Sequence, residues 1–304
     1  MADAPIISLR GIANRFGPVT VHENLDLDVL PGEVLGLIGG SGSGKSVLLR
    51  TILGLRRPQA GDVRVLGVDI THADEAARRA VRRQWGVLFQ DGALFSSLTV
   101  IENIKVPLRE FTNLPPDAMD DVAAMKLRMV GLAPEAALKY PSELSGGMRK
   151  RAGLARALVM DPAVVFLDEP TAGLDPIGAA AFDALIADLR AALGLTVVMI
   201  THDLDSLYAV CDRVAVLAEK RIYAVGTIDE LLRVDHPWLR EYFTGPRGRV
   251  AAGVAEVSGH AGHDAPANGQ ARAGSPAGAT GSTGSTGSAG PGARAAGGVG
   301  DRAS

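Results

Sequence analysis

The sequence predicts an α/β fold with a parallel central sheet. Two apolar segments of strand length, residues 163–168 (AVVFLD) and 195–201 (LTVVMIT), flank an amphipathic segment of helical spacing, residues 178–193. Strand, helix and strand at this separation favour a parallel pair joined by a right-handed crossover. A third observation is the N-terminal region, residues 5–30, which alternates between apolar and polar residues in β-like runs.

The elements follow in order along the chain. Residues 5–16 and 19–30 are expected to be strands, and a Pro-Gly turn ends them. Residues 33–39 (EVLGLIG) indicate a short buried strand that ends in glycines, and residues 46–55 have helical spacing. Residues 115–160 are mainly helical in pattern. We therefore expect an α/β core with an N-terminal antiparallel β subdomain and an inserted helical subdomain over about residues 91–160.

Composition changes abruptly in the last part of the chain. Residues 251–304 are mostly Gly, Ala, Ser and Thr, with almost no large apolar side chains to offset the entropy of ordering. We expect a folded domain over residues 5–245 and a disordered tail over residues 249–304. His260 and His263 in this tail could bind a metal, but its composition favours solvated side chains.

Charge and cysteine content narrow the class of protein. A net charge of −3 and a pI near 6.1 give no strong attraction to nucleic acid, so we expect no nucleic-acid partner. The single cysteine, Cys211, cannot form an internal disulfide and indicates a reducing compartment. We expect no secretory signal, and no apolar run approaches the ~18 residues that cross a bilayer.

Residues 39–46 (GGSGSGKS) match the phosphate-binding loop. Glycines let backbone N–H groups curl toward phosphate oxygens, and the helix that begins near Lys45 adds the positive end of its dipole. Lys45 can then reach the β and γ phosphates, and Ser46 can hold Mg²⁺. A chance match is the alternative, but the preceding strand and following helix argue against it. The expected nucleotide-binding residues are Gly39, Gly40, Ser41, Gly42, Ser43, Gly44, Lys45, Ser46 and Val47.

A pair of acidic residues follows the strand at residues 163–168. Asp168 lies where that strand ends, at the edge of the sheet where open α/β folds bind ligands. Asp168 suits Mg²⁺, through water, and Glu169 is placed to orient an attacking water and accept its proton. Acidic residues often follow strands, so this pair alone is weak evidence for a nucleotide site. It becomes persuasive because the same chain also contains a phosphate loop.

Residues 144–158 (LSGGMRKRAGLARAL) supply a second anion-binding helix start. Its donors would be Ser145, Gly146 and Gly147. One chain then has two phosphate cradles but one nucleotide-binding loop. A head-to-tail homodimer, in which each cradle serves the partner's nucleotide, resolves the mismatch.

Three basic residues occupy the first turn of this expected helix, namely Arg149, Lys150 and Arg151. Their charges oppose the helix dipole, so we interpret them as a solvated basic face. Compensation by nearby phosphates is the alternative.

Together these motifs resemble the ATP-binding cassette family over residues 5 to about 230. The ordered set is the phosphate loop, Gln90, LSGGM, VVFLDE, AGLDP and ITHDL. The resemblance implies a RecA-like P-loop NTPase core and a dimer around two ATP molecules, each bound between one subunit's phosphate loop and the other's signature. Met148 replaces the usual Gln of the signature, and the phosphate contact does not depend on it.

The resemblance also implies individual roles. His202 would contact the γ phosphate, with a structural histidine as the alternative. Asp175 would lie in the loop that crosses the dimer, and Phe16 would stack on adenine unless it is a core residue. The implied cofactors are ATP and Mg²⁺; the implied catalytic residues are Glu169, His202 and Gln90, and the implied Mg²⁺ ligands are Ser46, Gln90 and Asp168.

The segment after Gln90 contains several apolar residues among small ones, and it has no Lys or Arg. A buried strand or helix edge is one interpretation. In this family the segment receives a coupling helix from a membrane-embedded permease, and its apolar residues would line the groove. Those residues are Leu94, Phe95, Leu98 and Val100.

Residues 89–115 and 141–158 resemble ATPase subunits of the bacterial maintenance-of-lipid-asymmetry system. This group implies phospholipid or other hydrophobic cargo and a location on the cytoplasmic face of the inner membrane. The implied partners are a transmembrane permease, an MCE-domain lipid-binding protein and a small STAS-domain subunit. Residues 235–248 resemble the group's short C-terminal extension, which can brace the neighbouring ATPase subunit.

Three alternatives remain. The ATPase of another transporter, an organic-solute importer or a solvent exporter, would share the ATP chemistry and differ in its partner contacts. A soluble switch in DNA repair or translation would carry a coiled-coil insertion or a second cassette, and the sequence has neither. A metabolite kinase would need neither LSGGM nor GLDP.

Overall fold

The computed structural model describes residues 4–244. The expected tail, with His260 and His263, and the last residues of the expected C-terminal extension lie outside the described residues. The limits expected for the folded domain, residues 5–245, and for its helical subdomain, about residues 91–160, stay predictions. Among the described residues, no helix combines the length and apolar character that crossing a bilayer requires.

The N-terminal region forms the expected antiparallel sheet, in the order β2-β1-β4-β5. Ile7 pairs with Val29 and Phe16 with Val19, so the first two strands form a long hairpin. Alternate side chains of the first strand, including Leu9, are buried, which is the pattern of a sheet with one covered face. The strands are β1 (Ile7–Phe16), β2 (Val19–Val29), β4 (Ala60–Val65) and β5 (Val68–Asp69).

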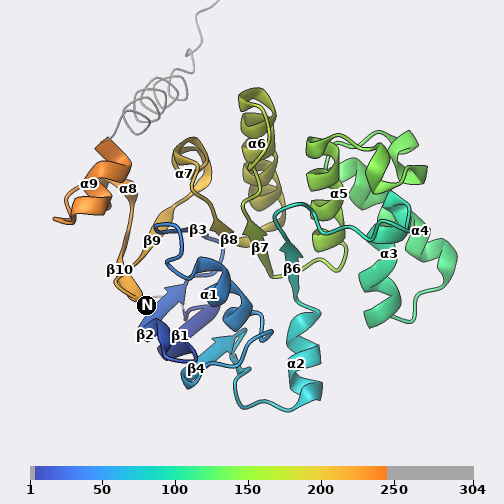
Figure 1. Ribbon diagram of the computed structural model, residues 1–304. Coiled ribbons are helices and arrows are strands. Elements are labelled where there is room, and N and C mark those ends of the chain that lie inside the picture. Colours follow the sequence, from blue (N-terminus) through green and yellow to red (C-terminus); the bar gives the residue numbers. More distant parts are fainter. Residues whose placement is uncertain (1–3, 245–304) are drawn as a thin grey trace, which may run out of the picture. The chain divides into compact units, whose positions relative to one another are not determined.

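A six-stranded sheet in the order β10-β9-β3-β8-β7-β6 forms the centre (Figure 1). All neighbours from β9 to β6 are parallel, and β10 is antiparallel to β9. Helix α6 (Pro176–Leu193) connects β7 to β8, which confirms the expected parallel pair joined by a helix. The strands are β3 (Val34–Ile38), β6 (Trp85–Leu88), β7 (Val164–Asp168), β8 (Thr196–Ile200), β9 (Arg213–Ala218) and β10 (Arg221–Gly226).

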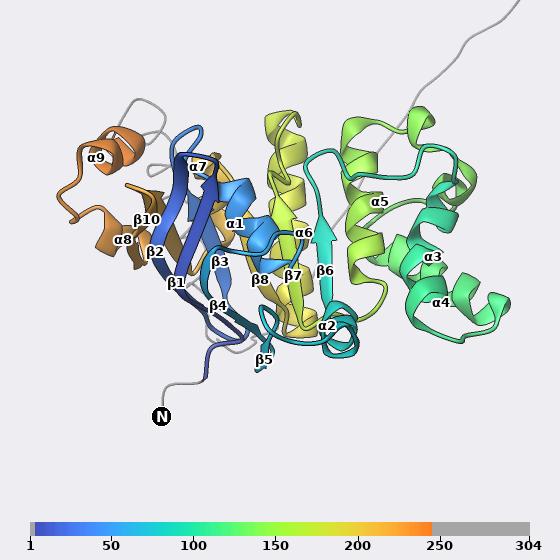
Figure 2. The same cartoon turned by 60° about the horizontal axis from the view of Figure 1, so that its bottom comes forward.

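Both faces of the central sheet are buried, which explains why its strands are continuously apolar. On one face, Leu35 and Phe166 pack with the antiparallel sheet and with helix α1 (Lys45–Ile52). On the other face, Val165 and Met199 pack with α6 and the helical region. Figure 2 shows the antiparallel strands and α1 in front of the central sheet, with α6 behind it.

The helical region lies beyond β6 in both Figure 1 and Figure 2. It contains α3 (Val100–Phe111), α4 (Pro116–Met129) and α5 (Gly146–Leu158), with the short 3₁₀ turns η1 (Pro134–Leu138) and η2 (Pro141–Glu143). Helix α3 begins earlier than the helical pattern predicts. Thr99 and Glu102 form a reciprocal capping box at its start, which fixes the boundary.

The remaining helices are α2 (Glu75–Arg82), α7 (Leu204–Val210), α8 (Ile228–Leu231) and α9 (Pro237–Thr244). Helix α9 falls within the expected C-terminal extension. Its Leu239 and Phe243 are buried in a third apolar cluster with Ile38 and Leu207. The extension therefore packs beside the strand that leads into the phosphate loop.

Candidate active site

The glycine-rich loop connects β3 to α1, as the sequence predicts. Gly42 and Gly44 have φ angles of 78° and 104°, a region that L side chains rarely adopt. A Cβ on Gly44 would also lie 2.5 Å from His22 Nε2. Position 44 therefore requires glycine both for its φ angle and for lack of space. Lys45 Nζ donates to the carbonyl oxygens of Gly39 (2.7 Å) and Gly40 (3.3 Å), which places the amine across the loop.

The carboxyl ends of four parallel strands bring the site residues to one edge of the sheet. The loop follows β3, Asp168 ends β7, His202 follows β8, and Gln90 follows β6. Gln90 is exposed at this edge. Parallel strands all present this end to the same side, so residues far apart in sequence lie around one ligand position.

Glu169 is held in an unusual backbone conformation. Its φ is 51°, which is uncommon for a residue other than glycine and occurs often at functional sites. Its N–H donates to the carbonyl of Ile200 at 2.8 Å, and its own carbonyl accepts from Lys150 Nζ at 2.8 Å. These two bonds hold the backbone from which the carboxylate extends.

His202 Nδ1 lies 2.7 Å from Glu169 Oε2, so the two predicted catalytic residues are in contact. The His202 side chain is 68% exposed, which argues against a buried structural histidine. An exposed imidazole beside a fixed carboxylate can reach a ligand at the sheet edge. The roles assigned to both residues stay predictions.

The charges at the sheet edge suit phosphate and a divalent cation. Burial raises the pKa of Asp168, as does the neighbouring Glu169, while Arg50 and Lys45 lower it. Burial lowers the pKa of Lys45, against the influence of Glu169 and Asp168. Ser43 Oγ is buried in the loop and has no hydrogen-bond partner among residues 4–244. An amine, adjacent carboxylates and an unpaired hydroxyl fit a Mg²⁺-nucleotide.

The signature helix α5 lies away from the phosphate loop of the same chain. Ser145 Oγ accepts from Met148 N at 3.2 Å and caps α5, and Asp175 Oδ1 accepts from Gly178 N at 2.9 Å and caps α6. In both Figure 1 and Figure 2, β6 and β7 lie between α1 and α5. One chain therefore does not bring Ser145 to Lys45, which agrees with the predicted head-to-tail pair.

Phe16 is 48% exposed, so the interpretation of this residue as part of the core is wrong. The Arg56 guanidinium lies 3.7 Å from the centroid of the ring and covers one face. Stacking of the ring on adenine stays a prediction.

The structure corrects the interpretation of the basic turn in α5. Lys150 is only 4% exposed and donates to the carbonyl of Glu169, so it is not part of a solvated face. Arg151 is half-buried and donates to the carbonyl of Val130 at 2.7 Å. Arg149 is exposed, as expected.

The apolar residues after Gln90 differ in their exposure, so only some of them could contact a partner. Val100 is fully buried at the start of α3 and cannot line a groove for a partner, because it packs inside the helical region. Leu94 packs partly against the same core. Phe95 is 53% exposed and stays available for contact.

A buried polar network beneath the phosphate loop was not predicted. Asn14 Nδ2 lies 3.0 Å from Thr51 Oγ1 and 3.0 Å from His22 Nδ1. Burial lowers the pKa of His22 to about 4, so its ring is neutral at physiological pH. The available signal was a polar residue, Asn14, at a position of β1 where alternation places a buried side chain.

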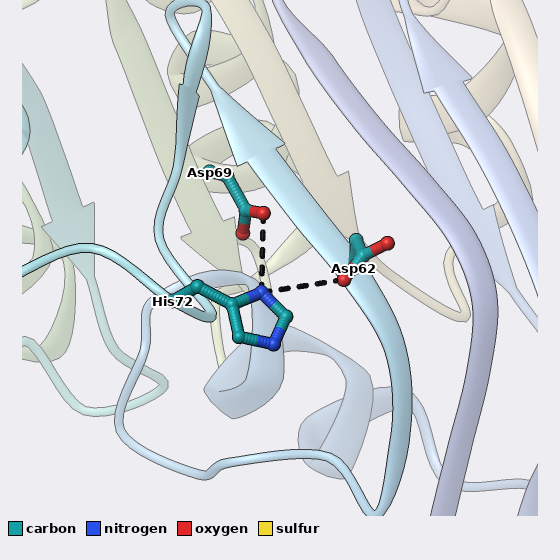
Figure 3. A group of neighbouring side chains, drawn as sticks. All are labelled: Asp62, Asp69 and His72. Carbon is teal, nitrogen blue, oxygen red and sulfur yellow. Dashed lines mark hydrogen bonds and ion pairs between the residues drawn. The ribbon is translucent and has the colours of Figure 1, made fainter.

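A second polar cluster lies on the antiparallel sheet (Figure 3). His72 Nδ1 lies 3.2 Å from Asp69 Oδ2 and 3.4 Å from Asp62 Oδ1. Partial burial raises the pKa of Asp69, but hydrogen bonds, that from His72 first, bring it below its usual value. The exposed imidazole lies within reach of both carboxylates, which accounts for the cluster as a polar contact on the surface.

Comparison with known proteins identifies the family. Residues 22–172 match the family model described as ABC transporter. The chain is 41% identical over 241 residues to the probable ribonucleotide transport ATP-binding protein mkl of Mycobacterium leprae, covering 79% of this chain and 69% of the relative. It is 38% identical over 228 residues to the intermembrane phospholipid transport system ATP-binding protein MlaF of Haemophilus influenzae, covering 75% and 86%.

Solved structures agree with this match. The dimeric ATP-binding cassette MJ0796, in a post-hydrolysis state bound to ADP and Pi, has a TM-score of 0.67 and 28% identity, covering 73% of this chain and 98% of that one. For cbiO1 from Clostridium perfringens, part of the ABC transporter complex cbiONQ, the TM-score is 0.69 and the identity 27%, covering 83% and 99%. The chain therefore belongs to the ABC transporter family, and within it is an ATP-binding domain that hydrolyses ATP.

Proposed function

We propose that this chain drives lipid transport between bacterial membranes, as the ATPase partner of a permease and an MCE-domain lipid-binding protein. The main support for this proposal is the 38% identity of the chain, over 228 residues, to a relative named for intermembrane phospholipid transport. The segments around Gln90 and the signature, which resemble lipid-asymmetry ATPases, support the same assignment. The proposed location is the cytoplasmic face of the inner membrane, and a STAS-domain subunit is a further candidate partner.

Two copies would close head to tail on two ATP molecules. Lys45 and His202 of one subunit hold the γ phosphate together with the partner subunit's Ser145, and Phe16 stacks on adenine. Glu169 orients a water and accepts its proton, in keeping with the 2.7 Å contact that fixes its carboxylate beside His202. Mg²⁺, when bound, neutralises phosphate charge, and Ser46, Gln90 and Asp168 are the residues that would hold it.

Closure is proposed to reach the permease through the helical region. The segment after Gln90 joins β6 to α3, and Phe95 is exposed within it. Arg156 donates to the carbonyls of Gly92 (2.8 Å) and Ala93 (2.7 Å), which ties this segment to α5. Movement of the signature helix would therefore move the permease contact with it.

Import of an organic solute is the second candidate function. The chain is 40% identical over 225 residues to the methionine import ATP-binding protein MetN of Brucella abortus, covering 74% of this chain and 60% of that relative. Such a transporter uses the same ATP chemistry. Only the partners distinguish the two functions.

The test is to purify the chain from gently solubilised native membranes and identify its partners by mass spectrometry. A permease together with an MCE-domain protein supports lipid transport. A solute-binding protein, or a permease without an MCE-domain protein, overturns the lipid assignment and keeps the ATPase. Recovery of no membrane protein would favour a soluble switch.

A matched pair of surface variants makes the same experiment specific. Phe95→Asp places a charge on the proposed permease contact and should remove the permease from the purified complex. Leu55→Asp places it on another exposed apolar residue, 66% exposed just after α1, and should leave the complex intact. Equal recovery of the permease with both variants would contradict the contact at Phe95.

Lys150→Met should lower turnover about tenfold with a smaller change in ATP affinity. The substitution removes a charged donor from the carbonyl of Glu169, and such hydrogen bonds are worth about 1.5–3 kcal/mol. The measurement is steady-state ATPase activity beside equilibrium ATP binding. Arg128→Met, at an exposed position of α4, is the control and should match the parent chain. Unchanged turnover in Lys150→Met would contradict the role.

A further inference from the structure

A buried polar cluster connects the loop after Glu169 with the loop after His202. Thr171 lies in the first loop, Asp203 in the second, and Asp183 and Ser206 come from α6 and α7. Thr171, Asp183 and Ser206 are 5%, 4% and 0% exposed. Asp203 directly follows His202, and its Oδ1 accepts from the N–H of Asp205 at the start of α7. Three of the four residues are therefore buried, and Asp203 is half-buried.

Two carboxylates compete for one hydroxyl in this cluster. Ser206 Oγ lies 2.8 Å from Asp183 Oδ2 and 3.3 Å from Asp203 Oδ2. A serine has a single hydrogen to donate, so it can serve only one of them at a time. Thr171 Oγ1 lies 3.4 Å from the same Asp203 oxygen and 3.2 Å from Ser206 Oγ. Thr171 is the other hydroxyl in reach of Asp203.

The surroundings move the protonation of Asp183 from strongly acidic to mildly acidic pH. Burial raises its pKa to about 6; the hydrogen bond from Ser206 acts against this, and the charges of Asp203 and Asp205 add to it. Asp183 Oδ1 is buried and has no hydrogen-bond partner among the described residues, which adds to the cost of ionisation. Two other titratable groups face the cluster, Cys211 and Tyr242. Burial raises the pKa of both, so they stay neutral.

The two protonation states give different hydrogen bonds. With Asp183 ionised, Ser206 donates to it over the shorter distance, and Thr171 is the hydroxyl left to donate to Asp203 Oδ2. With Asp183 protonated at Oδ2, the carboxyl group becomes the donor and Ser206 Oγ the acceptor. The hydrogen of Ser206 can then be donated to Asp203 Oδ2, which gains a second hydroxyl donor beside Thr171.

We propose that Asp183 is a positioning residue for His202: its proton directs Ser206 toward Asp203, and Asp203 steadies the loop that carries His202. The inference rests on the proposed role of His202 in ATP hydrolysis. It predicts that part of the pH dependence of turnover originates in a carboxyl group that never contacts nucleotide.

The test compares Asp183→Asn with the parent in the full-length chain, from about pH 5.5 to about pH 8.5. An amide donates at every pH, so Ser206 stays directed to Asp203. We expect the ratio of variant to parent turnover to be near one at the acid end. It should rise about threefold by the alkaline end, the size expected for one hydrogen bond. A ratio that does not change with pH overturns the inference.

Two further variants make the result specific. Asp188→Asn lies on an exposed position of the same helix and should give a ratio independent of pH. In a Ser206→Ala background the shared hydroxyl is gone, so Asp183→Asn should no longer change the pH profile. Persistence of the profile change in that background would show that Ser206 does not transmit it, and would overturn the proposal.

Denaturant unfolding separates titration from function. The folded-state pKa of about 6 lies above the usual Asp value of about 3.9, so the parent should lose stability relative to Asp183→Asn as pH rises between these values. Above this window the difference should be constant. Titration seen in unfolding with a flat turnover ratio overturns the inference and leaves the ATPase assignment intact. Wild-type turnover in His202→Ala would instead contradict the proposed function.

Discussion

Glu169→Gln should slow ATP hydrolysis by about 100-fold or more, because general base catalysis contributes roughly 10²–10⁴. Gln has the shape of Glu but cannot accept a proton from water. The backbone bonds of Glu169 to Ile200 and Lys150 do not involve its side chain, so the amide should occupy the same place. ATP binding should be retained, since the phosphate loop is untouched.

Steady-state turnover and equilibrium ATP binding are the measurements for this variant. Light scattering in the presence of ATP should also show a dimer that persists, because closure is no longer followed by hydrolysis. Glu135→Gln, an exposed position in η1, is the matched control and should behave as the parent. Turnover near the parent value in Glu169→Gln would show that another group activates the water.

Sequence alone was sufficient where chemistry restricts the residue types. The loop at residues 39–46 is recognisable because Gly42 and Gly44 need positive φ angles and because Gly44 has no room for a side chain. The buried strands β7 and β8 are recognisable because both faces of the sheet are covered. These local requirements leave direct traces in composition and spacing.

Lys150 could not be placed from the sequence because its partner is a backbone carbonyl. Its acceptor is the backbone oxygen of Glu169, a residue with a φ of 51°, and nothing in the sequence reports such a conformation or contact. A lysine in the first turn of a helix opposes the dipole and usually lies in solvent. Tertiary contact here outweighs that preference.

The cluster around Ser206 was hidden for a similar reason. Asp183 and Ser206 lie on different helices, and their contact depends on the packing of α6 beside α7. The start of α3 is different, because the capping box of Thr99 and Glu102 is a local signal present in the sequence. The capping box makes Val100 the first residue of α3, where its side chain packs into the core of the helical region.

Lys45→Ala should weaken ATP binding by about 100-fold or more, since a charged hydrogen bond is worth about 1.5–3 kcal/mol and the charge balance of the site changes as well. Lys45 lies close enough to Asp168 and Glu169 for their charges to affect its pKa. Without the amine, these carboxylates would face the phosphates uncompensated. Binding therefore loses an attraction and gains a repulsion.

Equilibrium titration with ATP is the measurement, with the ATP-induced rise in melting temperature as a second readout. Lys139→Ala, at an exposed position after η1, should bind ATP as the parent does. Lys45→Arg should not restore affinity, because a planar guanidinium does not fit between the carbonyls of Gly39 and Gly40 as a compact amine does. Tight ATP binding by Lys45→Ala would mean that the nucleotide lies elsewhere, and the assignment of the glycine-rich loop would have to be abandoned.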